Sequence, residues 1–177
     1  MIIPVNKIVK ADAFEELSRF KDGSFNAIIT DPPYDFTEEQ ILWLHEQFCR
    51  LSSNIIVFAP PENPWVYPAN QYGFWIKPIS TKNTSKSYSR FVECIYFYNI
   101  TTWNAGRHWS QYTNVFTDLV DDTKVHPYRK PPSLIERLIR NHTNEGDLIL
   151  DPFAGSGVIL DVAQRLNRKC ISLEITA

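Results

Sequence analysis

The stretch LILDPFAGSGVILDVAQRL, residues 148–166, decides the fold class of this chain. Its first three residues are an apolar run typical of a short buried strand, and the apolar residues after Gly157 recur at helical spacing. Between the two lies a glycine-rich loop that begins at Asp151. Such a loop lets a ligand approach the backbone closely at the amino end of the helix. The stretch therefore predicts a strand, a ligand-binding loop and a helix in a parallel sheet.

The same alternation of strand-like and helical patterns extends outward over most of the chain. Strand-like apolar runs occur at residues 7–9, 25–30, 54–59, 74–79, 91–100, 148–150 and 171–175. Helical spacing occurs at 41–51, at 134–139 and at 158–166. The runs at 74–79 and 91–100 are close enough to pair as a hairpin, whereas 101–124 has no regular pattern. This order predicts an α/β fold with a mainly parallel sheet and helices on its faces.

Length and composition are those of an ordinary globular protein. With 44% hydrophobic and 21% charged residues among 177, the chain can bury one core, so we expect one domain over 1–177. The net charge of -2 excludes a uniformly basic protein, so any nucleic-acid contact requires a local basic patch. The three cysteines show no CxxC spacing, so we expect no metal site and no disulfide framework. Without a signal-peptide pattern or an apolar run near the roughly 20 residues of a membrane span, we expect a cytoplasmic protein with no membrane contact.

Two acids accompany the glycine-rich loop. Asp151 stands where a pyrophosphate would meet a repelling charge, so the loop favours a ligand with an ammonium or hydroxyl groups. Glu174 ends the next strand, close to the roughly 20-residue offset at which an acid holds ribose hydroxyls. The pattern therefore indicates a nucleoside with a cationic tail. The alternative interpretation makes Asp151 a helix cap and Glu174 a solvated residue.

A second unusual stretch is DPPY, residues 31–34, directly after the apolar run at 25–30. The two prolines remove backbone donors and keep the chain extended, so the strand cannot simply continue. An ordinary turn after a strand would account for it. A rigid wall that holds specific acceptors is the functional alternative.

Three motifs in order carry a family resemblance: DPPY at 31–34, HPYRKP at 126–131 and DPFAGSG at 151–157. Together they resemble the S-adenosylmethionine-dependent amino-methyltransferases of DNA, in the permuted, β-class motif order. Weaker similarities are ADA at 11–13 and FWIKP at 74–78, with Glu93 further on. The resemblance implies a Rossmann-like, seven-stranded, mostly parallel sheet with one antiparallel hairpin strand and helices on both faces. It also places the strand ending at Glu174 between those ending near Asp12 and Asp151.

The resemblance further implies S-adenosyl-L-methionine as the cofactor. Asp12 would receive the amino group of the cofactor's adenine, and Glu174 would hold its ribose. Lys130, at a predicted helix start, would bind the cofactor's carboxylate, although a stiff linker would also explain 126–132. The full set of implied cofactor-binding residues is Asp12, Ala13, Asp31, Lys130, Ser133, Asp151, Phe153, Gly155, Ser156, Gly157 and Glu174.

The implied catalytic residues are Asp31, Pro32, Pro33 and Tyr34. The side chain of Asp31 and the carbonyl of Pro32 would accept hydrogen bonds from the target amino group, and Tyr34 would stack on an extruded base. Aspartate in the first position resembles adenine-N6 enzymes and serine resembles cytosine-N4 enzymes, so the resemblance favours adenine N6 in DNA. Cytosine-N4 methylation, an RNA or glutamine acceptor and a catalytically silent nucleic-acid-binding subunit remain alternatives.

The expected target-recognition insert, residues 101–124, is short. It mixes aromatic and basic residues, and the preceding loop adds further cations, so we expect both to line a DNA cleft. The expected nucleic-acid-binding residues are Lys82, Lys86, Arg90, Trp103, Arg107, His108 and Trp109. A loop folded back on the core as a lid is the alternative. So small a target-recognition insert is expected to recognise a short DNA site or to act within a homodimer. The sequence does not say whether a restriction enzyme accompanies the protein.

Overall fold

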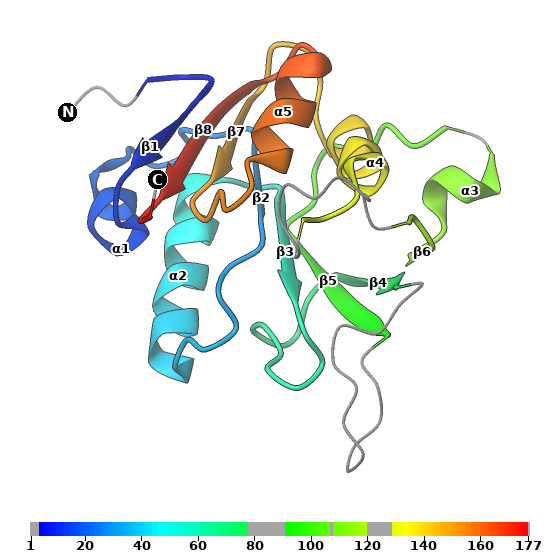
Figure 1. The fold of residues 1–177 in the computed structure, drawn as a ribbon, viewed down its shortest axis with the longest axis horizontal. Helices are drawn as coiled ribbons and strands as arrows, with labels where there is room; N and C mark the ends of the chain where they lie inside the picture. The colour runs from blue at the N-terminus through cyan, green and yellow to red at the C-terminus, as the bar shows by residue number, and fades with distance from the viewer. Residues whose placement is uncertain (1–3, 78–90, 107, 120–128, 177) are drawn as a thin grey trace.

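The computed structural model describes residues 4–77, 91–106, 108–119 and 129–176. Its centre is one sheet with the strand order β1-β8-β7-β2-β3-β5-β4-β6 (Figure 1). The strands are β1 (Lys7–Lys10), β2 (Ala27–Thr30), β3 (Ile55–Ala59), β4 (Gln71–Ile76), β5 (Val92–Tyr98), β6 (Val115–Phe116), β7 (Leu148–Asp151) and β8 (Lys169–Glu174). The helices are α1 (Ala13–Glu16), the 3-10 helix η1 (Leu17–Arg19), α2 (Glu38–Leu51), α3 (Trp109–Tyr112), α4 (Pro132–His142) and α5 (Val158–Arg165).

Within this sheet β5 is the strand that runs against its neighbours. It pairs antiparallel with β3 and with β4, whereas β1, β8, β7, β2 and β3 are mutually parallel in that order. The predicted hairpin partners are therefore neighbours, and the predicted mostly parallel α/β sheet is confirmed. The expected position of β8, between β1 and β7, is also confirmed.

Among the described residues the sheet has eight strands rather than the expected seven, because β6 adds one. It lies in the stretch expected to be irregular and pairs parallel with β4 through Val115 and Phe116. A strand of two residues leaves no periodicity in the sequence. It is held instead by close packing: a Cβ atom at Gly73 of β4 would lie 3.0 Å from the ring of Phe116, so only glycine fits without a shift.

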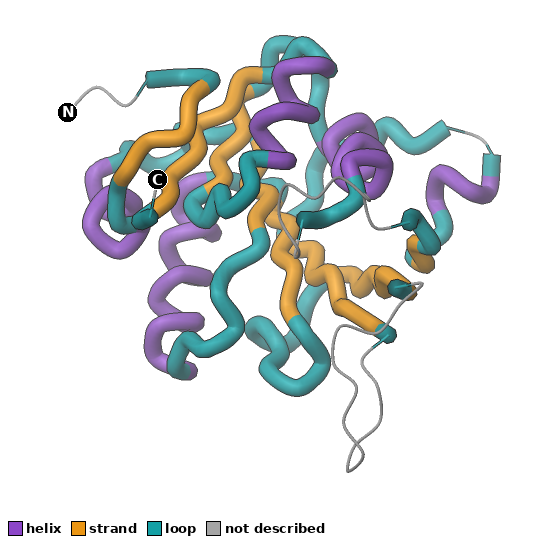
Figure 2. The backbone as a smooth tube through the Cα atoms, viewed as in Figure 1, coloured by secondary structure: helices purple, strands orange, loops and turns teal. Residues whose placement is uncertain are grey.

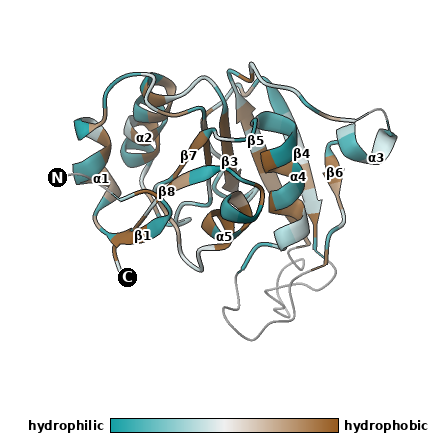
Figure 3. Cartoon of the chain, turned by 90° about the horizontal axis from the view of Figure 1, so that it is seen from above, coloured by the Kyte–Doolittle hydropathy of each residue, from teal (hydrophilic) through white to brown (hydrophobic). Residues whose placement is uncertain are grey.

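Helices cover both faces of the sheet, as expected. On one face α4 and α5 pack against the strands, and on the other face α1 and α2 do so (Figure 2). In Figure 3 the largely apolar strands form the layer between α2 and α5. α2 buries Ile41, Leu44, Phe48 and Leu51, the spacing predicted from the sequence. Thr37 and Gln40 begin this helix with a reciprocal capping box.

The parallel strands bring the sequence-predicted acids to one edge of the sheet. Asp31 follows β2 directly, and Asp151 and Glu174 are the last residues of β7 and β8. Because the carboxyl ends of parallel strands meet at the same edge, these three acids share the end of the sheet where ligands bind in open α/β folds. In the described part of the chain, no helix is both long and apolar enough to cross a membrane.

Candidate active site

DPPY leaves the sheet as a rigid segment beyond the end of β2. Pro32 is buried, whereas Pro33 is exposed and Tyr34 keeps 40% of its surface exposed. The amide of Asn63 donates to the backbone carbonyl of Tyr34 at 2.7 Å, which fixes the end of the segment. The tetrapeptide therefore forms a wall with a carboxylate at one end and an accessible aromatic ring at the other.

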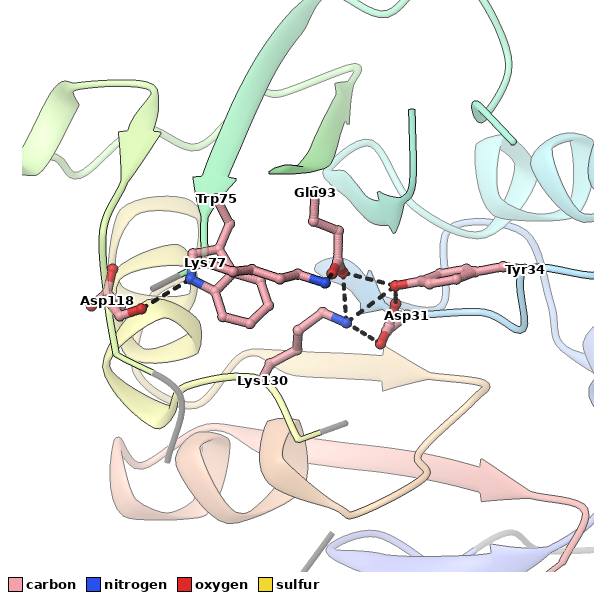
Figure 4. Close-up of polar contacts among 7 residues, drawn as sticks. All are labelled: Asp31, Tyr34, Trp75, Lys77, Glu93, Asp118 and Lys130. Carbon is pink, nitrogen blue, oxygen red and sulfur yellow. Dashed lines mark hydrogen bonds and ion pairs between the residues drawn. The ribbon is translucent and has the colours of Figure 1, made fainter. Parts of the chain in front are cut away.

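The carboxylate of Asp31 is partly buried and lies in a polar network with the buried side chains of Lys130 and Glu93 (Figure 4). The hydroxyl of Tyr34 lies 2.9 Å from Asp31 Oδ1 and 2.8 Å from Glu93 Oε1, and its one proton can serve either acceptor. The ammonium of Lys130 forms an ion pair with Asp31 Oδ2 and lies 2.7 Å from Glu93 Oε1. Three segments distant in sequence thus meet at the first residue of DPPY.

Glu93 is the centre of this network and comes from β5. Its side chain is 2% exposed, and its second oxygen pairs at 2.6 Å with Lys77, which directly follows β4. Trp75, two residues before Lys77, is held by a hydrogen bond from its indole nitrogen to the carbonyl of Asp118 at 3.0 Å. The network therefore contains two carboxylates and two ammonium groups, which balance in charge.

The pKa values of these groups follow from burial and from their partners. Burial raises the pKa of Asp31, although Lys130 opposes the shift. Burial also acts to raise the pKa of Glu93, but the charges of Lys130 and Lys77 outweigh it and hold this pKa below the ordinary value. The pKa of Lys130 is raised because Asp31 and Glu93 outweigh its burial. Burial raises the pKa of Tyr34, so its phenol stays neutral and donates a hydrogen bond.

Asp151, at the end of β7, is completely buried beside DPPY. Its Oδ1 accepts a hydrogen bond from Thr30 Oγ1 at 2.9 Å and from the backbone nitrogen of Phe153 at 3.3 Å. Its Oδ2 is buried and has no partner among the described residues. Burial raises the pKa of Asp151 to about 7. An unpaired buried carboxylate oxygen suits a ligand that brings a positive charge or a hydrogen-bond donor.

The loop after Asp151 has the conformation that its glycines allow. Gly155 and Gly157 adopt φ values of +47° and +74°, and the space around a Cβ at Gly155 is open. The backbone nitrogen of Gly155 donates to Glu174 Oε2 at 2.7 Å. Burial acts to raise the pKa of Glu174, but this bond and those from Thr176 lower it below the ordinary value. A charged carboxylate and an open backbone turn therefore face the same space.

Comparison with known proteins identifies the family of this chain. A family model described as DNA methylase, for N6 and N4 methyltransferases, matches residues 44–177. The chain belongs to this DNA methylase family. It is accordingly an enzyme of the DNA amino-methyltransferase family, with S-adenosylmethionine as cofactor and DNA as substrate class.

Individual relatives agree with the family. The type II methyltransferase M.HpaI of Haemophilus parainfluenzae is 24% identical over 96% of this chain and 70% of its own length. M2.DpnII of Streptococcus pneumoniae is 26% identical over 94% of this chain and 84% of its own length. The M1.HpyAVI–SAM complex superposes with a TM-score of 0.73 at 26% identity, covering 95% of this chain and 92% of that one.

Within the methylase, the remaining predicted cofactor residues lie at two places. Asp12 follows β1 and caps α1, accepting a hydrogen bond from the backbone nitrogen of Phe14 at 2.8 Å, and Ala13 is buried beside it. Ser133 is exposed in the first turn of α4. Lys130 precedes that turn, and its ammonium is paired with Asp31 and Glu93.

The predicted DNA-binding residues of the methylase are only partly visible. Lys82, Lys86, Arg90 and Arg107 lie outside the described residues, as do positions 126–128 of the HPYRKP motif. Trp103, His108 and Trp109 are exposed on the segment around α3. Trp103 also packs against His142 of α4 at 5.3 Å between ring centroids. The predicted reader is therefore an exposed aromatic surface attached to α4.

Sequence reasoning assigned no site role to several residues of the methylase site. The sequence assigns Glu93 and Lys77 only to the weaker similarities with the family. An acid within the apolar strand 92–98 is nevertheless a signal of a buried charge that needs a partner. The sequence predicts no role for Phe36, which lies two residues after DPPY. Its ring centroid lies 5.4 Å from that of Phe14 and 5.5 Å from that of Phe153, so it joins the start of α1, next to Asp12, to the loop after β7.

Proposed function

We propose that this methylase transfers a methyl group to the N6 amino group of adenine in DNA, after the base has been turned out of the duplex. The observation that carries the proposal is the carboxylate of Asp31 at the end of β2, immediately beside the glycine-rich loop. Thr30 Oγ1 donates to Asp151 Oδ1, so the residue before DPPY touches the residue that begins the loop. An amino acceptor and a cofactor site thus adjoin.

Support for adenine comes from the motif and from one relative. Aspartate in the first position of DPPY resembles adenine-N6 enzymes. The DNA adenine methyltransferase YhdJ of Escherichia coli is 44% identical over 59 residues, which are 33% of this chain and 20% of that protein. The cytosine-N4-specific PvuII DNA methyltransferase has a TM-score of 0.73 but only 18% identity, so it shares the fold alone.

The chemistry of the acceptor explains the DPPY segment. The lone pair of an exocyclic amino group is delocalised into the base, so the group is a weak nucleophile. Hydrogen bonds from the amino group to Asp31 and to the carbonyl of Pro32 favour a pyramidal nitrogen and stabilise its growing positive charge. The rigid prolines keep both acceptors aimed at one point. The new N–C bond would form as the S–CH3 bond of the sulfonium breaks and its electron pair stays on sulfur; the nitrogen thereby becomes positively charged and then loses one proton, to Asp31 or to water.

Tyr34 gives the reason for an extruded base. A base paired within the duplex cannot reach an acceptor at the end of β2, so it must be extruded. Extrusion costs a few kcal/mol. Stacking on an aromatic side chain stabilises an extruded base by about 1–3 kcal/mol. The ring of Tyr34 is 40% exposed, and its hydroxyl is tied to the Asp31 network. It is therefore held rigidly beside the acceptor.

The residues at the strand ends fit S-adenosylmethionine. Glu174 offers a charged carboxylate for ribose hydroxyls, the open turn at Gly155 admits close approach, and Asp151 Oδ2 is an unpaired acceptor for the cationic part. When bound, the cofactor supplies a methyl group activated by its sulfonium. The protein's task is then to align the amino group with that methyl group. We assign cofactor contacts to Asp12, Ala13, Phe153, Ser156 and Gly157 as well.

Mass analysis of nucleosides from treated DNA tests the proposal. Unmethylated duplex DNA, single-stranded DNA and RNA are incubated with the protein and methyl-labelled cofactor, then digested. We expect N6-methyladenine from DNA. N4-methylcytosine alone would overturn the choice of base, and label in RNA but not in DNA would overturn the choice of nucleic acid.

A further inference from the structure

The ammonium of Lys130 lies in a site that is built for a cation. Besides its two carboxylate partners, it lies 5.1 Å from the ring centroid of Phe58, 5.9 Å from that of Tyr34 and 6.0 Å from that of Trp75. Aromatic faces at such distances attract positive charge. Lys130 is only 5% exposed, so these contacts replace its hydration.

The target amino group requires the same place. On the proposed function, this group must donate to Asp31 and becomes positively charged as the methyl group is transferred. Oδ1 of Asp31 is engaged by Tyr34, and Oδ2 is engaged by Lys130 (Figure 4). The ammonium of Lys130 therefore occupies one of the positions from which an amino group can donate to Asp31.

Glu93 gives Lys130 a second partner when Asp31 turns to the base. Its Oε1 lies 2.7 Å from the ammonium, and its Oε2 is already neutralised by Lys77. Releasing Asp31 therefore does not leave the buried ammonium without a counter-charge, which would be strongly unfavourable.

We propose that Lys130 is a positioning residue that holds the place of the target amino group at Asp31 and keeps this carboxylate charged until the base arrives, while Glu93 retains Lys130 afterwards. The proposal rests on the proposed function for the identity of the arriving group. It differs from the expectation that Lys130 binds the carboxylate of the cofactor.

The charges that face Asp31 determine what the loss of Lys130 does. Tyr34 faces it from its own segment, Glu93 from β5, Asp151 from β7 and Lys130 from the segment before α4. Among these four described groups, Lys130 carries the positive charge, whereas the others are two carboxyl groups and a phenol. Burial and the charge of Glu93 raise the pKa of Asp31, and Lys130 counteracts both. Without it the pKa rises further, so the ionised acceptor forms only at higher pH.

The test compares Lys130→Met with Lys130→Arg. The neighbouring Arg129→Met is the matched control, because Arg129 pairs at 2.9 Å with Asp161 of α5 and is not among the described residues that form a hydrogen bond or ion pair with Asp31. Carbon-13 NMR of aspartate carboxyl groups, assigned with Asp31→Asn, follows the titration of Asp31. Two further measurements are made on each variant. One is kcat for methyl transfer to unmethylated DNA as a function of pH, and the other is the dissociation constant of S-adenosylmethionine by calorimetry.

We expect Lys130→Met to raise the pKa of Asp31 by at least about one unit. The acid limb of kcat should move upward by a similar amount, with the cofactor dissociation constant within about threefold. Lys130→Arg should restore most of both, and Arg129→Met should change neither. If Lys130→Met does not fold, Lys130→Gln, which removes the charge but keeps a hydrogen-bond donor, takes its place with the same expected rise.

An unchanged titration of Asp31 in a folded Lys130→Met variant overturns the proposal. Weaker cofactor binding with an unchanged pH profile also overturns it and assigns Lys130 to the cofactor carboxylate. A parent protein that methylates no DNA overturns the proposed function instead, and the carboxyl titration still decides whether Lys130 sets the charge of Asp31.

Discussion

Asp31 is the residue on which the proposed chemistry depends. Its carboxylate is bound to Lys130 and Tyr34, and among the described residues it forms no hydrogen bond or ion pair with the glycine-rich loop. Asp31→Ala should therefore abolish methyl transfer while leaving the cofactor dissociation constant within a few-fold, as measured by radiolabel transfer and calorimetry. Asp35→Ala, an exposed acid in the same segment, is the control. Loss of cofactor binding together with activity would show that Asp31 serves the cofactor.

Asp151 gives stability a pH dependence with a definite sign. Burial holds its pKa at about 7, so the folded protein keeps a proton that the unfolded chain releases near pH ~4. The contribution of this group to the free energy of unfolding is thus fully present below pH ~4 and is lost as the pH rises through about 7. Asp151→Asn should flatten this fall in the free energy of unfolding. Urea titrations at several values between roughly pH 5 and pH 8 measure it. A parallel pH dependence in parent and variant would show that Asp151 does not carry it.

Glu174 should act on the cofactor before it acts on the methyl acceptor. Its charged carboxylate is tied to Gly155 and Thr176, at the mouth of the loop. Glu174→Ala removes an acceptor for ribose hydroxyls, and the loss of a hydrogen bond to a charged group should weaken cofactor binding about tenfold or more. Calorimetry measures this, with the exposed Glu145→Ala as control. An unchanged dissociation constant would leave Glu174 a purely structural residue of the loop.

At the scale of elements, α4 carries the segment around α3. The guanidinium of Arg137 donates to the carbonyl of Ser110 at 2.8 Å and lies 3.7 Å from the ring centroid of Phe116, and Asn141 donates to the carbonyl of Gln111 at 2.8 Å. The exposed aromatic surface is therefore fixed to the helix that begins just after Lys130.

Arg137→Met should loosen this attachment. Amide hydrogen exchange in residues 108–116 should become about tenfold faster, because local opening no longer breaks these contacts. Affinity for DNA should fall while cofactor affinity stays unchanged. Arg140→Met is the control, since the partner of Arg140 among the described residues is Glu136 of the same helix. Equal exchange in both variants would contradict the attachment.

Elements with a long periodic pattern could be predicted from the sequence, and short ones could not. α2 and the strands β3, β5 and β7 follow from the spacing of apolar residues, and the place of β8 follows from the motif order. β6 could not be found, because two residues carry no period and their pairing depends on the space above Gly73. The ion pair between Lys130 and Asp31 was also missed. It joins positions 99 residues apart, and the sequence pattern linked the lysine to the neighbouring helix start instead.

At the scale of the whole molecule, the charge balance limits how DNA can be held. A net charge of -2 supplies no general attraction for phosphates, so affinity must come from few cations. Lys86, outside the described residues, is the sequence-predicted phosphate contact. Lys86→Gln should weaken binding to all DNA sequences alike and lower the slope of log K against log salt by about one.

Arg107, also outside the described residues, is the predicted base contact. Arg107→Ala should in addition blur the preference among target sites. If both variants bind and methylate DNA as the parent does across a salt series, the predicted reader is wrong and the lid interpretation is favoured.

The sheet order also determines when a growing chain can become active. β1 is synthesised early, yet its partner β8 is made last of the strands and lies between β1 and β7. In a growing chain, β1 and the adjoining Asp12 therefore lack their neighbour in the sheet until Lys169–Glu174 is free to pair. One late insertion then brings Asp12, Glu174 and the loop after β7 together. A nascent chain stalled before β8 has DPPY in full but lacks the strand that completes the proposed cofactor site.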